Sequence, residues 1–183
     1  MHRNRSEPEM EKAYESFRRA VDINPNESTS NFNIGHFLYH RGLHHQAMEY
    51  YLKALELDPL DVSIYCFIGW ARGMSGDSDQ AMVAFQKALE FEPGFIIAVH
   101  GYARVLIRLK KYEEAAELLA RSEKINPNNS FKATQAWLCA ANGEREEAFK
   151  LLKESQAEDR YDKIVLYSLL GLKDEAIELL NSQ

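Results

Sequence analysis

The chain of 183 residues has few cysteines, few prolines and no long apolar run. Its two cysteines, Cys66 and Cys139, are far apart in the sequence, which is typical of a reducing compartment and not of a disulfide framework. No segment approaches the run of about 18 apolar residues that spans a membrane, and the first residues are charged, unlike a secretory signal peptide. We therefore expect a soluble, cytoplasmic protein without membrane insertion.

A basic excess and catalytic signatures are also missing. Lys and Arg number 22 against 28 Asp and Glu, for a net charge of −6. A nucleic-acid binder needs clustered positive charge, so no nucleic-acid partner is expected. The sequence contains no glycine-rich phosphate loop, no nucleophile motif and no carboxylate pair that stands out from the many glutamates. We therefore expect no enzyme activity and no cofactor.

What the sequence does contain is a repeat of 34 residues, which four of its five prolines follow. A fixed period of this size indicates one supersecondary unit copied head to tail, and therefore a solenoid. Such a fold offers an extended surface rather than a central pocket. The recurrent residues are the prolines Pro25, Pro59, Pro93 and Pro127, the alanines Ala13, Ala47, Ala81 and Ala115, and the larger residues Phe17, Tyr51, Phe85 and Leu119.

Each repeat is predicted to fold into two helices. In residues 28–61, small and apolar residues recur at helical spacing on both sides of Gly42, which can end the first helix with a positive φ. Pro59 ends the second helix, because proline disfavours the helical conformation of the residue before it. Small residues such as Gly35 let the two helices approach closely. The third repeat has Lys110 in place of the turn glycine, which predicts a less tight turn.

These residues resemble the tetratricopeptide repeat. The resemblance implies an all-α, right-handed superhelical solenoid of antiparallel helix pairs. The pentatricopeptide repeat, an RNA-reading relative, is the main alternative, but the recurrent alanines and prolines and the acidic charge argue against it. The matching pattern is Ile34-Gly35, Gly42, Ala47, Tyr51, Ala54 and Pro59, which recurs as Ile68-Gly69, Gly76, Ala81, Phe85, Ala88 and Pro93.

The register predicts eleven helices, one unpaired second helix followed by five pairs. The fourth repeat is one residue short, and the fifth follows after only 28 residues, so the last pair is the least regular. A cut through a longer array would explain the unpaired helix. The expected segments are the unpaired second helix in 1–27, tetratricopeptide repeats in 28–61, 62–95 and 96–128, a shortened repeat in 129–158 and a degenerate helix pair in 159–183.

The resemblance also implies a function, which is to bind a peptide or protein segment in a concave groove lined by the first helices, as an adaptor or scaffold. Large aromatic residues and arginine are the types that anchor interfaces. Cys66 and Ile107 also map to this groove, but ordinary packing explains them better. The expected groove residues are Phe32, His36, Tyr39, His40, Trp70, Met74, His100, Arg104, Arg108 and Trp137.

Other roles stay open at this stage. The chain could be a regulatory or substrate-binding region of a larger enzyme or secretion-associated protein, or a chaperone for exported proteins. Arrays that clamp the acidic C-terminal tails of cytosolic chaperones use Lys, Asn and Arg on their first helices, and that ligand is not expected here, although Arg104 and Arg108 could receive some acidic group. The positions that match the clamp hold Phe32, His36, Phe67, Ile97 and Gly101.

Four histidines, His36, His40, His44 and His45, form a cluster that resembles a metal site. A spacing of four places His36 and His40 on one helical face, a geometry that can chelate a transition metal. No acidic third ligand follows on that face, and the turn at Gly42 redirects the other two histidines. We therefore expect no metal, and groove or exposed histidines whose ligand binding could depend on pH.

The unpaired N-terminal helix predicts self-association. A solenoid end normally carries a polar cap, and this helix has apolar residues instead. Burying about 400 Å² of apolar surface would contribute roughly 10 kcal/mol, against an association cost of about 4–15 kcal/mol. We expect a weak homodimer, with residues 1–6 folding back over the helix as the competing outcome. The contact residues would be Ala13, Phe17, Ala20 and Val21.

Overall fold

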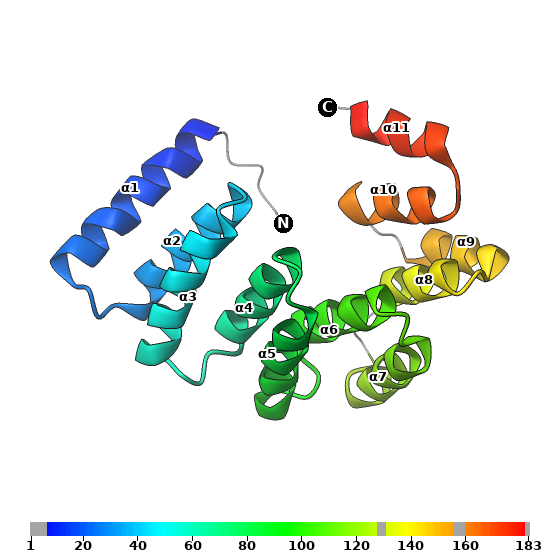
Figure 1. The fold of residues 1–183 in the computed structure, drawn as a ribbon, viewed down its shortest axis with the longest axis horizontal. Helices are drawn as coiled ribbons and strands as arrows, with labels where there is room; N and C mark the ends of the chain where they lie inside the picture. Colours follow the sequence, from blue (N-terminus) through cyan, green and yellow to red (C-terminus); the bar gives the residue numbers. More distant parts are fainter. Residues whose placement is uncertain (1–6, 128–130, 156–159, 182–183) are drawn as a thin grey trace. The chain divides into compact units, whose positions relative to one another are not determined.

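The computed structural model describes residues 7–127, 131–155 and 160–181. Within these ranges the chain forms eleven α-helices and no strand (Figure 1), which confirms the predicted all-α solenoid of helix pairs. The chain divides into two compact units, the first ending at Glu92 and the second beginning at Pro93. The helices are α1 (Glu7–Ile23), α2 (Ser28–His40), α3 (His44–Leu57), α4 (Val62–Met74), α5 (Ser78–Phe91), α6 (Ile96–Arg108), α7 (Tyr112–Ile125), α8 (Lys132–Ala141), α9 (Arg145–Glu154), α10 (Arg160–Leu169) and α11 (Lys173–Asn181).

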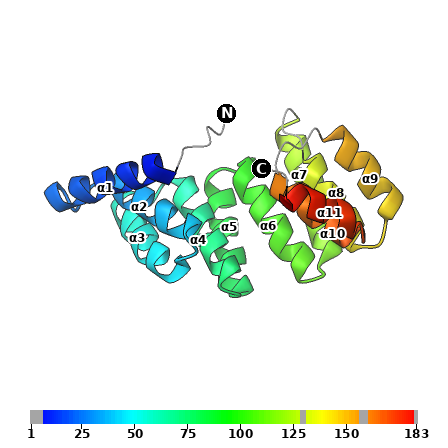
Figure 2. The ribbon, with the colours of Figure 1, turned by 90° about the horizontal axis from the view of Figure 1, so that it is seen from above.

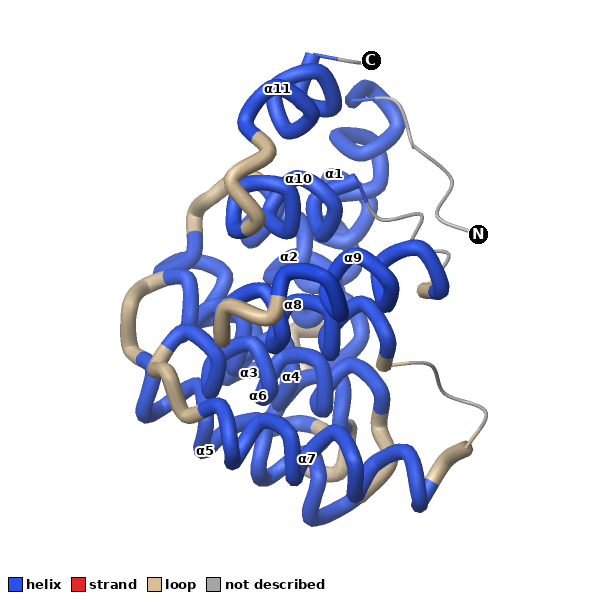
Figure 3. Tube along the Cα trace, turned by 90° about the vertical axis from the view of Figure 1, so that its right-hand side faces the viewer, coloured by secondary structure: helices blue, strands red, loops and turns tan. Residues whose placement is uncertain are grey.

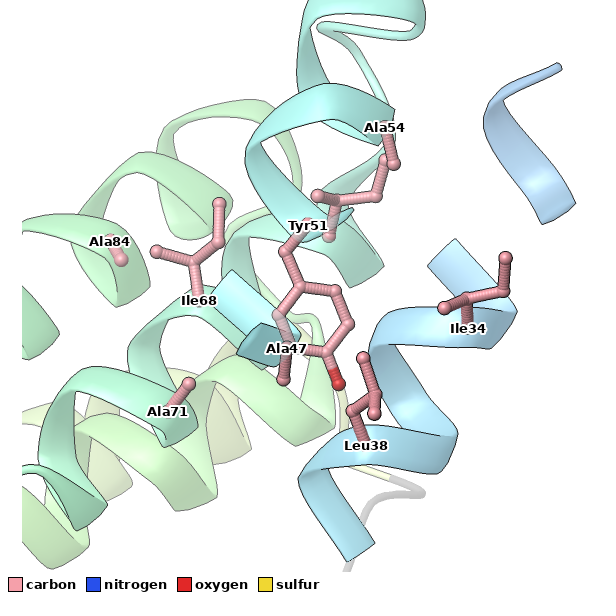
Figure 4. Close-up of a cluster of buried hydrophobic side chains, with 9 residues drawn as sticks. Ile34, Leu38, Ala47, Tyr51, Ala54, Ile68, Ala71 and Ala84 are labelled. Atoms are coloured by element: carbon pink, nitrogen blue, oxygen red, sulfur yellow. The ribbon is translucent and has the colours of Figure 1, made fainter. Parts of the chain in front are cut away.

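The first unit consists of α1 and the pairs α2–α3 and α4–α5 (Figure 2). Helix α1 packs on α2, and α3 packs on α4, so each second helix contacts the first helix of the next pair. Short loops join the helices (Figure 3). The core between them holds small and apolar side chains, and Figure 4 shows the Tyr51 ring among its neighbours. The core residues are Ile34, Leu38, Ala47, Tyr51, Ala54, Ile64, Ile68, Ala71 and Ala84.

Glycine permits the close crossing inside each pair of the first unit. An added Cβ on Gly35 would lie 2.8 Å from Cδ1 of Tyr51, and one on Gly69 would lie 2.7 Å from Cζ of Phe85. Real Cβ atoms do not approach this closely, so each ring occupies space that only glycine leaves open. The predicted role of small residues at the helix crossing is thus confirmed at these two positions.

The turns inside the pairs share one hydrogen-bond pattern. Gly42 has a φ of 76°, and its N–H donates to the Tyr39 carbonyl oxygen at 2.9 Å. The N–H of the next residue, Leu43, donates to the Leu38 carbonyl oxygen. Lys110 has a φ of 60°, and its N–H lies 3.0 Å from the Ile107 carbonyl oxygen in the same pattern. The expected loosening of this turn is therefore wrong. The hydrogen bonds hold Lys110 in the left-handed region, at a cost of about 1–2 kcal/mol for a residue with a Cβ.

The second unit consists of the pairs α6–α7, α8–α9 and α10–α11. Helix α8 packs on both α6 and α10, so the first helices of this unit are neighbours. The Arg145 side chain donates a hydrogen bond to the Leu170 carbonyl and ties the fourth pair to the fifth. The predicted repeat boundaries at 128/129 and 158/159 lie outside the described residues. The core of the last two pairs contains Ala136, Ala140, Ala148, Leu152, Leu166 and Leu170.

Candidate functional site

The first unit gathers aromatic rings on its first helices. Phe67 of α4 lies with its ring centroid 5.2 Å from Phe32 and 4.9 Å from His36, both of α2. Tyr39 lies 6.3 Å from Phe67 and 5.4 Å from His40. We call these five residues the α2–α4 face. The four predicted residues of α2 therefore lie together, and the ring that joins them comes from the next repeat.

His36 and His40 form a direct contact on this face. Their Nε2 atoms are 3.2 Å apart, so one ring donates an N–H and the other accepts it. Burial lowers the pKa of His36 to about 4, with a smaller contribution from His40, and burial lowers the pKa of His40 as well. Both rings are therefore neutral near pH 7. Across the described ranges, no group of three or more His, Cys, Asp or Glu side chains is arranged to hold a metal ion.

The α4 residues predicted for the groove differ in their surroundings. Trp70 is half-buried, and its ring stands edge-on to Phe85 at 5.5 Å, while Met74 at the end of the helix is exposed. Cys66 is fully buried, and burial raises the pKa of its thiol to about 12, so the thiol stays protonated. Ile107 of α6 is also buried. Cys66 and Ile107 are thus packing residues, as the sequence predicts.

The second unit presents a different chemistry on α6 and α8. The Arg104 guanidinium carbon lies 4.2 Å above the centre of the Trp137 ring, in a cation–π contact. His100 shares a hydrogen bond with the Thr134 hydroxyl, and its ring lies 5.2 Å from Phe131. Burial, together with the Arg104 charge, lowers the pKa of His100 to about 4, so this ring is neutral near pH 7. We call these five residues the α6–α8 face.

Arg108 lies one helical turn beyond Arg104 and is exposed at the end of α6. Three residues of the two faces are absent from the groove residues expected from the sequence. Phe67 stands three places before Trp70 on its helix, and Thr134 stands three places before Trp137, so helical spacing could have found both. Phe131 carries no comparable signal, because it lies just before the start of α8.

The predicted self-association residues of α1 divide into two kinds. Phe17 and Val21 are partly buried and pack against the core of α2 to α5. Ala13 and Ala20 are half-buried and contribute less to that core. The competing fold-back of residues 1–6 falls outside the described residues.

The position of α1 on α2 is fixed by two further contacts. Tyr14 stacks on Phe37 of α2 with ring centroids 4.2 Å apart. Glu11 forms an ion pair with Arg41, whose guanidinium also lies over the Phe37 ring. Both contacts hold α1 against α2.

Models of the tetratricopeptide repeat match residues 28–59 and residues 74–138 of this chain. A structure of a tetratricopeptide repeat protein from Parabacteroides merdae is 18% identical, has a TM-score of 0.69, and is matched over 94% of this chain and 71% of its own. YrrB, described as a TPR protein with an unusual peptide-binding site, is 23% identical with a TM-score of 0.60, over 92% of this chain and 90% of its own.

MamA is 21% identical with a TM-score of 0.65, over 81% of this chain and 87% of its own. At such identities the likeness shows the fold. Among curated proteins no significant sequence match is found. None of the helices that the structure describes is both long and apolar enough to cross a membrane.

Proposed function

We propose that this chain, which belongs to the tetratricopeptide repeat family of protein–protein interaction modules, is a non-catalytic adaptor that binds a polypeptide segment through its first helices. One observation carries the proposal: side chains of the types that anchor interfaces gather on the first helices of both units. In the first unit they are the rings of the α2–α4 face, and in the second they are Arg104 and Trp137 of the α6–α8 face.

Several features support a polypeptide as the ligand. The rings offer large apolar contact areas at a low cost in side-chain entropy, as interface aromatics do. The neutral His36–His40 pair adds a donor and an acceptor suited to peptide groups. The net charge of −6 disfavours nucleic acid. YrrB, which shares the fold, is described as having a peptide-binding site. A cytoplasmic location, expected from the cysteine usage, remains a prediction.

The test is selection of binding peptides from a random dodecapeptide library displayed on phage. We expect Trp70→Ala and Trp137→Ala to weaken the binding of the selected peptides about thirtyfold, the effect of an anchor worth about 2 kcal/mol. Phe91→Ala is the matched control, because Phe91 is an exposed aromatic residue at the end of a second helix. Selected peptides that bind both tryptophan variants as well as the parent, with the variants still folded, would place the ligand elsewhere.

Roles inside a larger enzyme or a secretion-associated protein, or as a chaperone for exported proteins, would use the same surfaces. The identity of the partner captured from the source cells separates these roles from that of a free-standing adaptor. Capture with the parent and with Trp137→Ala in parallel identifies the proteins that depend on the proposed face.

We also propose weak self-association through α1. In the complete pairs, the alanines that face the partner helix are fully buried, and Ala13 holds the same register but is only half-buried. Phe17→Glu is a poor test, because Phe17 packs against the core and its loss would disturb the fold. We expect Ala13→Glu to abolish the dimer, and Lys12→Glu, which changes an exposed residue, to leave it intact. Light scattering over a wide concentration range measures both outcomes. A strict monomer of the parent would contradict the interface. The buried alanines are Ala47, Ala81, Ala115 and Ala148.

A further inference from the structure

The charges of this acidic chain are distributed unevenly between its helices. The first helices α2, α4, α6 and α8 contain no Asp or Glu, and the first helix α10 contains one, Asp162. The second helices α3, α5, α7 and α9 each contain at least two. The basic residues on the four first helices are Arg72, Arg104, Arg108 and Lys132. The surfaces proposed to bind the partner are therefore neutral or positive in a chain whose net charge is −6.

The α6–α8 face concentrates this positive charge. Arg104 and Arg108 are one turn apart on α6 and so project from the same side of the helix. His100, one turn before Arg104, is neutral near pH 7, and Thr134 is uncharged. Both arginines stay charged at all relevant pH values. Helix α6 therefore contains two arginines, and neither α6 nor α8 contains a carboxylate.

The contact with Trp137 organises one of these charges. Its ring lies 4.2 Å below the Arg104 guanidinium carbon, which restricts the rotamers of a long side chain. A guanidinium on an aromatic face keeps its N–H donors in its own plane, where a carboxylate can accept two of them at once. Ordering the arginine before the ligand arrives lowers the entropic cost of binding.

We infer that the α6–α8 face recognises Asp or Glu side chains of an acidic polypeptide segment, with Arg104 and Arg108 as the recognising residues. This inference rests on the proposed function and specifies its ligand. Charge complementarity carries it, because the acidic second helix α7 repels such a segment, whereas α6 contains two arginines and no carboxylate. Trp137 then serves two purposes, since it holds Arg104 and offers an apolar surface beside the carboxylate.

The peptide library tests this inference directly, since the sequences of the selected peptides report the chemistry of the face. We expect enrichment of Asp and Glu over the unselected library. A selected peptide resynthesised with Gln in place of Glu should bind about tenfold more weakly, as expected for the loss of a charge-assisted bond. Binding of the acidic peptide should also weaken as the salt concentration rises, because salt screens the exposed charges.

Arg104→Gln and Arg108→Gln should each reproduce the tenfold loss for the acidic peptide and leave the binding of its Gln analogue unchanged. Arg104→Lys should have an intermediate effect, because lysine keeps the charge but loses the planar donors. The matched control is Arg121→Gln, which removes an exposed arginine of the second helix α7. If Arg104→Gln fails to fold, Arg108→Gln decides the result.

Two failures are distinguishable. Peptides that depend on Trp137 but show no acidic enrichment, or that bind Arg104→Gln and Arg108→Gln as well as the parent, would overturn the inference and leave the proposed function standing. An equal loss of affinity for the acidic peptide in Arg121→Gln would overturn the inference too, because the effect would then come from the overall charge of the protein. Selected peptides whose binding is independent of both tryptophans would contradict the proposed function itself.

Discussion

Gly35 and the ring of Tyr51 occupy one crossing between α2 and α3, and the ring fits because residue 35 has no side chain. The pair of Gly69 and Phe85 repeats this relationship in α4 and α5. At the equivalent positions of the next two repeats, alanine accompanies leucine, and all four side chains are buried. A ring thus goes with glycine and leucine with alanine, because the sum of the two volumes is limited by the helix spacing. The alanine–leucine pairs are Ala103 with Leu119 and Ala136 with Leu152.

Gly35→Ala tests this relationship. We expect it to lower the free energy of unfolding by about 1–3 kcal/mol, the range for overpacking a tight core, in urea denaturation followed by circular dichroism. The double change Gly35→Ala with Tyr51→Leu recreates the pair found in later repeats. It should cost less than the sum of the two single changes, since the clash disappears. Additive effects of the two changes would show that the side chains do not compete for one space.

Tyr51→Phe should raise the free energy of unfolding by about 1 kcal/mol, the scale of an unpaired buried hydroxyl. The Tyr51 hydroxyl is buried and has no hydrogen-bond partner among the residues that the structure describes. Phe85 fills the same position one repeat later. The matched control is Tyr65→Phe, which removes a hydroxyl that donates to the Pro59 carbonyl at 3.2 Å and should therefore be neutral or destabilising. A loss of stability in Tyr51→Phe would indicate a hydrogen bond that the described residues do not supply.

Lys110→Gly should stabilise the protein by about 1 kcal/mol, because glycine adopts a positive φ without the steric cost that Lys110 bears. Thermal or urea unfolding measures the gain. The reverse change, Gly42→Lys, should destabilise the first turn by a similar amount, since Gly42 has a φ of 76°. No gain in Lys110→Gly would mean that the lysine side chain makes contacts that offset its backbone strain.

The stability of the protein should fall as the pH drops from about 6.5 toward 4 because of His36 and His100. Burial lowers the pKa of both to about 4, from an ordinary value of 6.5. In that window the unfolded chain binds more protons than the folded one, so the free energy of unfolding decreases with falling pH. Above pH 6.5 both states leave the rings neutral, and the full stability is present.

Urea unfolding at pH 7 and pH 5 gives the change in the free energy of unfolding between the two pH values. This change is compared between the parent and each variant, because carboxylates also titrate at low pH and contribute equally to all of them. His36→Gln and His100→Gln should each reduce the loss of stability between the two pH values. His45→Gln changes an exposed histidine of α3 and serves as the control. Equal pH dependence in the parent and all three variants would show that the buried rings do not carry the effect.

Some contacts of the candidate site follow from spacing within one helix, and others depend on how different helices pack. A spacing of four residues in the sequence places His36 and His40 on one face, and the structure confirms that they touch. The ring that completes this face, Phe67, comes from another helix. Likewise the repeat register marks Arg104 and Trp137 as groove residues, but the contact between them depends on how α8 packs on α6.

The sequence by itself determined the all-α solenoid, because the period of 34 residues and its glycine and proline punctuation act locally, within each helix and turn. Tertiary packing decided what local chemistry leaves open. It packed Phe17 and Val21 of α1 against the core of the first unit, where both are partly buried. The left-handed conformation of Lys110, by contrast, is a local effect, because the hydrogen bonds of the turn to Leu106 and Ile107 outweigh the strain of one residue.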